Sequence, residues 1–214
     1  MNLPFTVEQF MKVFESYNQA IWPMQILAYI LGLIALYILL RKVSIANRAV
    51  SAILAIFWLW MGVAYHIGYF SEINKVANIF GALFIIQSIL FIVFGVIKQR
   101  IVFDYKLDKN TVVGGLFIAY ALVIYSLIGI ILGHTYPRAP IFGVAPCPTA
   151  IFTFGLFLYT KKLPKSVLII PLLWSIIGFV AALKLGIRED IGLLLAGLIS
   201  TTMIVLRDRN TTKA

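Results

Sequence analysis

The sequence contains a single cysteine, Cys147, and therefore cannot form an intramolecular disulfide. Charged residues are also scarce, because they make up 12% of the 214 residues and only 8 of them are Asp or Glu. Soluble domains carry about 25% charged residues. A domain of this size cannot bury an apolar fraction of 62%, because much of a small fold faces solvent. These shortages exclude an ordinary soluble domain and indicate that lipid is the natural solvent.

Clustered basic residues are also lacking, although the net charge is +10. Nucleic-acid-binding proteins gather Lys and Arg on one patch or helix, whereas here they lie in short gaps between apolar runs. The dispersed pattern argues against nucleic acid as a partner. It is better explained as a topology signal, with attraction to anionic lipid headgroups as a second effect. The lipid bilayer is therefore the expected partner.

Long apolar runs are abundant, and seven of them approach the roughly 20 residues that a membrane-spanning helix needs. Backbone groups in lipid must be hydrogen-bonded within their own segment, so the runs predict helices and not strands. The fifth and seventh runs are short, and the fifth extends back to Ile141 on one interpretation. The predicted fold is an all-α polytopic membrane bundle with spans at 21–40, 49–70, 76–97, 111–132, 147–160, 167–183 and 191–206.

The gaps between these runs predict the orientation of the chain. Positive residues prefer the cytoplasmic side of a membrane. Alternate gaps and the C-terminal tail hold 13 of the 18 basic residues, which places the N-terminus outside and the C-terminus in the cytoplasm. The cytoplasmic set is Arg41, Lys42, Arg48, Lys98, Arg100, Lys106, Lys109, Lys161, Lys162, Lys165, Arg207, Arg209 and Lys213.

Residues 1–20 have a different pattern from the runs that follow. Thr6 and Gln9 are spaced as a capping box, in which each side chain bonds a backbone N–H of the other residue. Phe10, Phe14 and Tyr17 then recur at helical spacing. We expect a short amphipathic helix on the outer surface, followed by a bundle over 21–206 and a cytoplasmic tail over 207–214.

Polar and aromatic side chains gather near the outer ends of the predicted spans. Polar or ionisable residues inside a membrane are expensive, so they indicate function by default. Aromatic residues at span ends are usually interfacial anchors, and this is the better interpretation of Trp22 and Tyr136. The sequence predicts a ligand-binding site for a small solute, drawn from Trp58, Tyr65, Asn74, Asn78, Gln25 and Tyr136.

A metal site is a second expectation for the same side of the membrane. His66, His134 and Cys147 form an N/N/S ligand set that suits zinc or copper, and Glu72 could be a fourth ligand or a base. Pro148 is expected at the first position of a helix, with Cys147 as its N-cap. A thiol at a helix N-terminus is activated by the positive end of the helix dipole. The alternative is that Cys147 is a small inert hydrophobe.

Three stretches of the sequence carry a family resemblance: 22–25, 65–74, and 133–149 with its Pro-Cys-Pro at 146–148. They resemble an uncharacterised family of bacterial multi-pass membrane proteins, a domain of unknown function. The resemblance implies a prokaryotic cell membrane and supplies no activity. Other seven-span families fit less well. Retinal proteins need a lysine in the last span, which 191–206 lacks, and seven-span zinc hydrolases use three histidines where this chain has two.

The expected function is binding or transport of a small solute, or of a soft metal such as zinc or copper, by a multi-pass protein of the cell inner membrane. One alternative is an intramembrane metal-dependent hydrolase that uses the same His, Cys and Glu residues around an activated water. Another is a b-type haem-binding subunit, ligated by His66 and His134. A non-catalytic partner subunit is a further possibility, and the oligomeric state is open.

Overall fold

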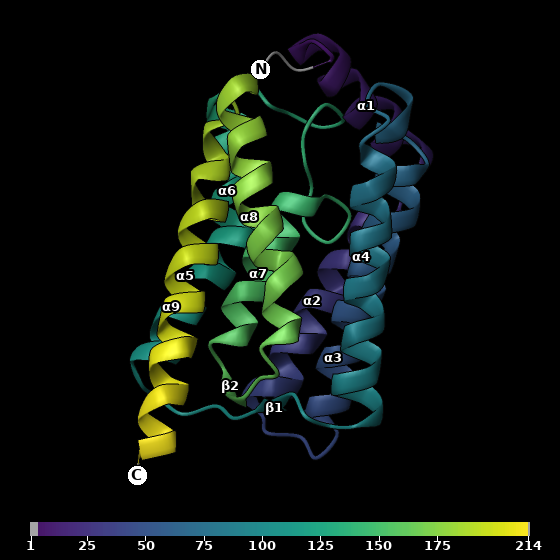
Figure 1. The fold of residues 1–214 in the computed structure, drawn as a ribbon. Coiled ribbons are helices and arrows are strands. Elements are labelled where there is room, and N and C mark those ends of the chain that lie inside the picture. The colour runs from purple at the N-terminus through teal and green to yellow at the C-terminus, as the bar shows by residue number, and fades with distance from the viewer. Residues whose placement is uncertain (1–3, 214) are drawn as a thin grey trace.

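The computed structural model describes residues 4–213, and most of these belong to helices that stand side by side (Figure 1). Several helices continue directly into π-helical or 3-10 segments, labelled η. The elements in chain order are α1 (Val7–Ala20), α2 (Met24–Leu40), α3 (Ala46–Trp60), η1 (Met61–Ile67), η2 (Phe70–Glu72), α4 (Ala77–Phe91), η3 (Ile92–Ile97), β1 (Val102–Phe103), α5 (Lys109–Ala119), η4 (Tyr120–Ile124), α6 (Tyr125–Ile131), α7 (Pro146–Phe157), β2 (Thr160–Lys162), α8 (Ser166–Leu185), η5 (Arg188–Asp190) and α9 (Ile191–Lys213).

The predicted all-α bundle is confirmed, and most of its helices are apolar enough for a membrane. Five helical segments of the described chain are long and apolar enough to cross a membrane. The pair α1 and α2, with a bend of 84° between them, is a sixth if the pair is counted as one span. Each of the seven predicted runs is helical, but α7 is too short to count as a span. The number of crossings therefore stays a prediction. The five segments are Ala46–Glu72, Ala77–Ile97, Lys109–Ile131, Ser166–Leu185 and Arg188–Arg209.

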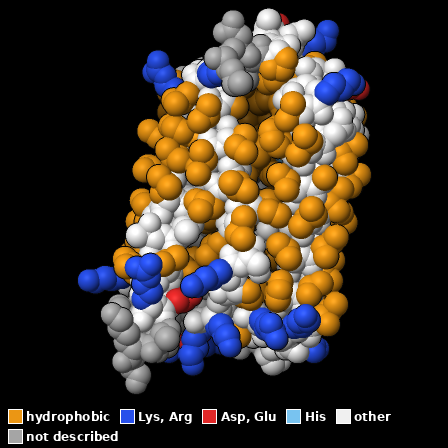
Figure 2. Space-filling view, viewed as in Figure 1, with side chains coloured by type: hydrophobic (Ala, Val, Ile, Leu, Met, Phe, Trp, Pro, Cys, Tyr) orange, Lys and Arg blue, Asp and Glu red, His pale blue; other side chains and the backbone are white. Residues whose placement is uncertain are grey.

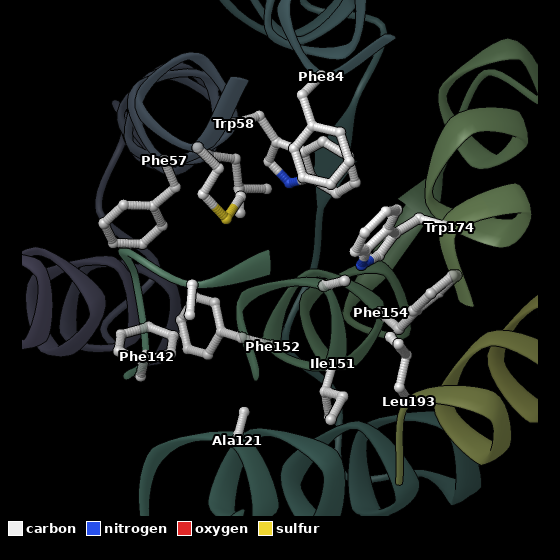
Figure 3. Packing of buried hydrophobic residues seen from close by; sticks show 14 of the residues in the cluster. Phe57, Trp58, Phe84, Ala121, Phe142, Ile151, Phe152, Phe154, Trp174 and Leu193 are labelled. Carbon is white, nitrogen blue, oxygen red and sulfur yellow. The ribbon is translucent and has the colours of Figure 1, made fainter. Parts of the chain in front are cut away.

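The short helix α7 is the centre of the bundle (Figures 1 and 3). Every residue in it except Cys147 is buried, and it contacts α3, α5, α8 and α9. Aromatic side chains from the surrounding elements are directed at it, among them Trp58, Phe84 and Trp174. A helix that is apolar on all sides belongs in a core. The sequence indicates this position for α7, because residues 151–157 include no charged residue, and the structure buries all of them.

The chain reaches α7 from the end of the bundle where α1 lies, as an irregular loop that runs down inside the bundle (Figure 1). Phe142, Val144 and Ala145 in this loop are 0–2% exposed. Irregular backbone at membrane depth is tolerated where protein covers it. Gly143 permits the close approach, because its φ is +80° and a Cβ there would lie 2.4 Å from the Cβ of Ala28.

The start of α7 differs from the expected one by two residues. Pro146 is its first residue, and the N-cap is Ala145 in an extended conformation. Cys147 therefore lies inside the first turn, so the prediction that it is the N-cap is wrong. Both Pro146 and Pro148 suit the first turn, where a missing N–H leaves no bond unmade. The sequence alone therefore does not show which of the two prolines is the first residue of the helix.

The gaps that hold the predicted cytoplasmic cations meet at one end of the bundle. β1 and β2 pair as antiparallel strands, the Phe103 N–H donates to Asn47 Oδ1 at 2.8 Å, and Arg207 donates to the Thr160 carbonyl. Figure 2 shows Lys and Arg side chains gathered at this lower end. The prediction that these gaps share a side is thus confirmed, whereas the side of the membrane stays a prediction.

At the opposite end, α1 lies across the bundle (Figure 1). Its predicted capping box is confirmed, because the Gln9 N–H donates to Thr6 Oγ1 at 3.2 Å and the Thr6 N–H donates to Gln9 Oε1 at 2.8 Å. Its apolar side packs on protein, with Phe14 and Tyr17 buried. The Tyr17 hydroxyl donates to the Val144 carbonyl at 2.8 Å, which ties α1 to the buried loop. This end is called the outer end below.

Candidate functional site

Two consecutive carboxylic acids, Glu189 and Asp190, are buried near the outer end of the bundle. Glu189 is fully buried and Asp190 is 3% exposed. Gly186, with a φ of 73°, ends α8, and the short turn η5 then carries both acids into α9. Ionisable residues within a membrane bundle are costly and mark functional sites by default. These two acids are the strongest such signal in the described chain.

Asp190 has polar neighbours from two other helices. The Tyr125 hydroxyl donates to Asp190 Oδ1 at 2.6 Å, and the Cys147 thiol adjoins the same carboxyl group. Tyr125 begins α6 and Cys147 lies in the first turn of the central helix α7. Three segments that are distant in the sequence therefore meet at Asp190.

Glu189 faces a different set of neighbours. His134 Nδ1 lies 2.7 Å from Glu189 Oε1, and the Tyr120 hydroxyl donates to the Glu189 backbone carbonyl at 2.6 Å. With Glu189 ionised, His134 must be the donor, since a carboxylate only accepts. The second carboxylate oxygen, Oε2, is buried and has no hydrogen-bond partner in the part of the chain that the structure describes.

A cavity of about 220 Å³, here called the α8 cavity, is lined by Asp190. Its other polar lining residues include Cys147, Lys184 and Asn74, and Pro146 and Trp174 also line it. Figure 2 shows the surface hollowed between α8 and α4 near the outer end. Its walls are mainly apolar. Besides Trp174, six aromatic residues contribute to them, namely Phe5, Phe10, Phe14, Tyr65, Phe70 and Phe80, and α8 adds aliphatic side chains.

A second cavity of about 320 Å³, here called the α2 cavity, reaches Glu189. It lies between α2, α6 and the loop that precedes α7. Gln25 of α2 is 5% exposed and lines it. The Gln25 Nε2 donates to the Asn18 carbonyl at 2.8 Å, whereas Gln25 Oε1 has no partner among the described residues. Its aromatic lining consists of Trp22, Tyr29, Tyr125 and Tyr136.

The structure divides the predicted site residues between these two cavities. Tyr65, Asn74 and Cys147 line the α8 cavity. Gln25, His134 and Tyr136 line the α2 cavity. The two cavities adjoin the Glu189–Asp190 pair from different sides, so one predicted site becomes two neighbouring ones. Six of the ten predicted residues are found there, namely Tyr65, Asn74, Cys147, Gln25, His134 and Tyr136.

The other four predicted residues line neither cavity. Trp58 is fully buried, and its indole N–H donates to Thr153 Oγ1 at 3.1 Å, so it joins α3 to the central helix. Glu72 and Asn78 are exposed at the outer end. The fourth, His66, is buried in the core and is considered next.

His66 is surrounded by aromatic rings. Its ring centroid lies 4.6 Å from that of Phe84, 5.1 Å from that of Trp174 and 5.9 Å from that of Phe80. Both ring nitrogens are buried without a partner among the described residues. A buried histidine without a hydrogen bond is uncommon. Its neighbour Trp174 lines the α8 cavity, so His66 lies behind the wall of that cavity.

The predicted metal ligands do not converge. His66 packs among aromatic rings, His134 pairs with Glu189, Cys147 adjoins Asp190 and Glu72 is exposed. Within residues 4–213, no three His, Cys, Asp or Glu side chains are grouped so that they could hold a metal ion. Binding of zinc, copper or haem therefore gains no support from the placement of these residues.

Sequence reasoning missed Glu189, Asp190, Tyr125 and Trp174. The two acids follow Arg188 and directly precede the last apolar run. Charged residues at such a position are normally interpreted as a solvent-exposed loop between two spans. One signal was available, because the outer gaps hold few acids and two of them are adjacent at this position. Tyr125 and Trp174 resemble the many other aromatic residues of the spans, so only their neighbours identify them.

Comparison with known proteins identifies the family. No curated protein and no solved structure matches the chain. The model of one family, described as a family of unknown function (DUF6064), matches residues 7–214. The match includes α7, the acid pair and the residues that line both cavities, apart from Phe5. The chain therefore belongs to this family of unknown function, DUF6064.

Proposed function

We propose that the protein binds a small, mostly apolar solute in the α8 cavity as the first step of transport. The observation that carries the proposal is the composition of this cavity. Its walls are mainly apolar, with several aromatic rings, and its few polar lining residues include Asp190, Cys147 and Trp174. Ligand sites are typically apolar pockets with a few convergent polar groups that fix orientation. The matching solute has a flat apolar body and one hydrogen-bond donor directed at Asp190.

The central helix gives the reason to propose transport. Transporters commonly bind substrate where a helix is interrupted inside the membrane, because the unwound backbone and the helix end then face a cavity. α7 begins inside the bundle after irregular backbone. Pro146 and Cys147, at this interruption, line the α8 cavity. This arrangement favours a solute pathway over a purely structural role.

The proposed setting is the cytoplasmic membrane of a cell, crossed with the α1 end outside. The basic gaps meet at the end opposite to α1, and positive residues prefer the cytoplasmic side. The α8 cavity then opens on the outer side, between α8 and α4. Solute reaches it from the outer medium or from the outer part of the bilayer.

Indole is a suitable probe, since it is flat and apolar and has one N–H donor. We expect indole to raise the thermal unfolding midpoint of the purified protein in detergent. A ligand at a hundred times its Kd stabilises by about 2.7 kcal/mol. Indene, which replaces the N–H by CH2, should stabilise less, because it offers Asp190 no donor. The variant Asp190→Asn should reduce the difference between the two probes.

A matched pair of variants on α8 tests the location. Ala181 lines the α8 cavity, so Ala181→Phe should fill it and abolish the effect of indole. Leu183 is 65% exposed on the same helix, so Leu183→Phe should keep the full effect. The proposal fails if indole gives no saturable stabilisation of the wild-type protein, or if both variants respond like the wild type.

Metal binding remains a separate prediction for this chain. Binding of zinc or copper by His66, His134 and Cys147 would require these side chains to move away from their present neighbours, which are Phe84, Glu189 and Asp190. Metal analysis of the purified protein, compared between wild type, His66→Ala and Cys147→Ser, tests binding and the metal-dependent hydrolase alternative together. Haem ligation by His66 and His134 predicts a Soret band in the same preparation, and a colourless protein would remove that alternative.

A further inference from the structure

Two residues that line the α2 cavity each carry a buried acceptor atom without a donor among the described residues. The two atoms are Glu189 Oε2 and Gln25 Oε1. Both side chains line this cavity and are at least nine-tenths buried, with 0% and 5% exposure. A buried acceptor without a donor is destabilising by about 1–3 kcal/mol. Two such atoms on one cavity indicate that something with N–H or O–H donors belongs there.

Both acceptors are held in fixed positions. Gln25 is fixed through its amide nitrogen, which donates to the Asn18 carbonyl at 2.8 Å. Asn18 in turn donates to the carbonyls of Pro137 and Ala139 at 2.7 and 2.9 Å. Glu189 is fixed by His134 at its other carboxylate oxygen, at 2.7 Å. Acceptors positioned in advance bind a ligand with little loss of side-chain entropy.

The lining of the α2 cavity favours a cationic donor. The residues that line it include one carboxylate, that of Glu189, and no Lys or Arg; His134 also lines it and is bonded to Oε1 of this carboxylate, which leaves Oε2. Aromatic rings lie around the polar groups, and the centroids of Trp22 and Tyr136 are 6.3 Å apart. The faces of such rings attract ammonium groups, most strongly where water is excluded. A hydroxyl group could satisfy the acceptors but would gain nothing from the charge or from the rings.

We propose that the α2 cavity is a binding site for a primary ammonium group. The ammonium donates to Glu189 Oε2 and Gln25 Oε1 and lies against the aromatic lining. This site is separate from the proposed solute site in the α8 cavity and does not depend on it. Two sources share this chemistry, a free organic amine and the headgroup of an aminophospholipid. Ile26 and Ile130 line the cavity and are 49% and 56% exposed on the outside of the bundle, which leaves a route from the bilayer.

Phenethylamine and 2-phenylethanol are matched probes, because they differ only in the ammonium and hydroxyl groups. We expect phenethylamine to bind the purified protein at least tenfold more tightly than 2-phenylethanol, measured by calorimetry in detergent at neutral pH. Glu189→Gln should weaken phenethylamine binding at least tenfold and leave 2-phenylethanol nearly unchanged. Glu72→Gln, which removes an exposed carboxylate at the same end, should leave phenethylamine binding at the wild-type level.

The two sources are separated by repeating the titration in nanodiscs. If phosphatidylethanolamine weakens phenethylamine binding relative to phosphatidylcholine, whose headgroup has no N–H donor, the ammonium comes from lipid. If the two lipids give the same affinity, the ligand is a free amine. Equal binding of the two probes by the wild type would overturn the proposal, and so would unchanged phenethylamine binding by Glu189→Gln. Gln25→Leu is a second variant in case Glu189→Gln fails to fold, and it should also weaken phenethylamine binding.

Discussion

The Tyr125 hydroxyl donates a hydrogen bond of 2.6 Å to Asp190 Oδ1, and this bond lies in the wall between the two cavities. Tyr125 lines the α2 cavity, whereas Asp190 lines the α8 cavity. The neighbouring acid, Glu189, faces the α2 cavity. One turn before α9 therefore supplies a carboxyl group to each site.

Replacement of Tyr125 by Phe should destabilise the protein. The variant removes the donor to a buried carboxyl oxygen, and a buried acceptor left without its donor costs about 2 kcal/mol. The free energy of unfolding, measured in mixed micelles, checks this value. Tyr29→Phe is the control, because Tyr29 lines the same cavity, whereas the bond to Asp190 Oδ1 comes from Tyr125. A Tyr125→Phe variant as stable as Tyr29→Phe would contradict the importance of this bond.

The irregular loop before α7 should depend on Thr149. Its Oγ1 accepts from the Gly143 N–H at 2.8 Å and donates to the Ala145 carbonyl at 2.7 Å, both in buried surroundings. Thr149→Val leaves these groups unpaired and should destabilise by about 2 kcal/mol. Thr201→Val is the control, because Thr201 Oγ1 is buried without a partner among the described residues. Equal effects of the two substitutions in denaturant titrations would refute this account.

His66→Phe should stabilise the protein. Both ring nitrogens of His66 are buried without a partner in the described part of the chain, and aromatic rings surround it. An apolar ring of similar shape removes this penalty, so we expect a gain of about 1 kcal/mol in the free energy of unfolding. A loss of stability would show that His66 has a partner in the folded protein, such as a bound ligand or water.

The orientation can be tested by thiol labelling in intact cells. In a Cys147→Ser background, a single cysteine at Glu72 should react with a membrane-impermeant maleimide added from outside. A single cysteine at Leu107, which is 83% exposed at the basic end, should react only after the membrane is broken. The reverse pattern would place the α1 end in the cytoplasm. Labelling of both positions from outside would rule out a spanning bundle with these two ends on opposite sides.

Local features of the fold follow from the sequence. The apolar runs predict helices at the right places, because a helix satisfies its backbone hydrogen bonds within one segment. The Thr6 and Gln9 capping box is equally local, since its two partners are three residues apart. The grouping of basic gaps at one end also follows, because consecutive spans alternate in direction.

The sequence predicted at which end of the bundle the candidate site lies, but not which residues form it. His134 and Cys147 were expected to bind the same metal ion. Instead His134 pairs with Glu189, 55 residues away, and Cys147 adjoins Asp190. Such pairings depend on which helices become neighbours, and hydropathy does not specify this. Trp58 and His66 were expected in the site for their chemistry, yet their helix face packs into the core.

The sequence by itself determined that this is a helical bundle, apolar enough to cross a membrane, with its basic gaps at one end and many of its polar residues near the other. Hydropathy and charge act residue by residue, so they can be summed along the chain. Only the tertiary structure decided that α7 is a short central helix, that Glu189 and Asp190 are buried, and that two cavities flank them. These features arise from contacts between distant segments, because the loop before α7 and the turn before α9 become buried only when the other helices pack around them.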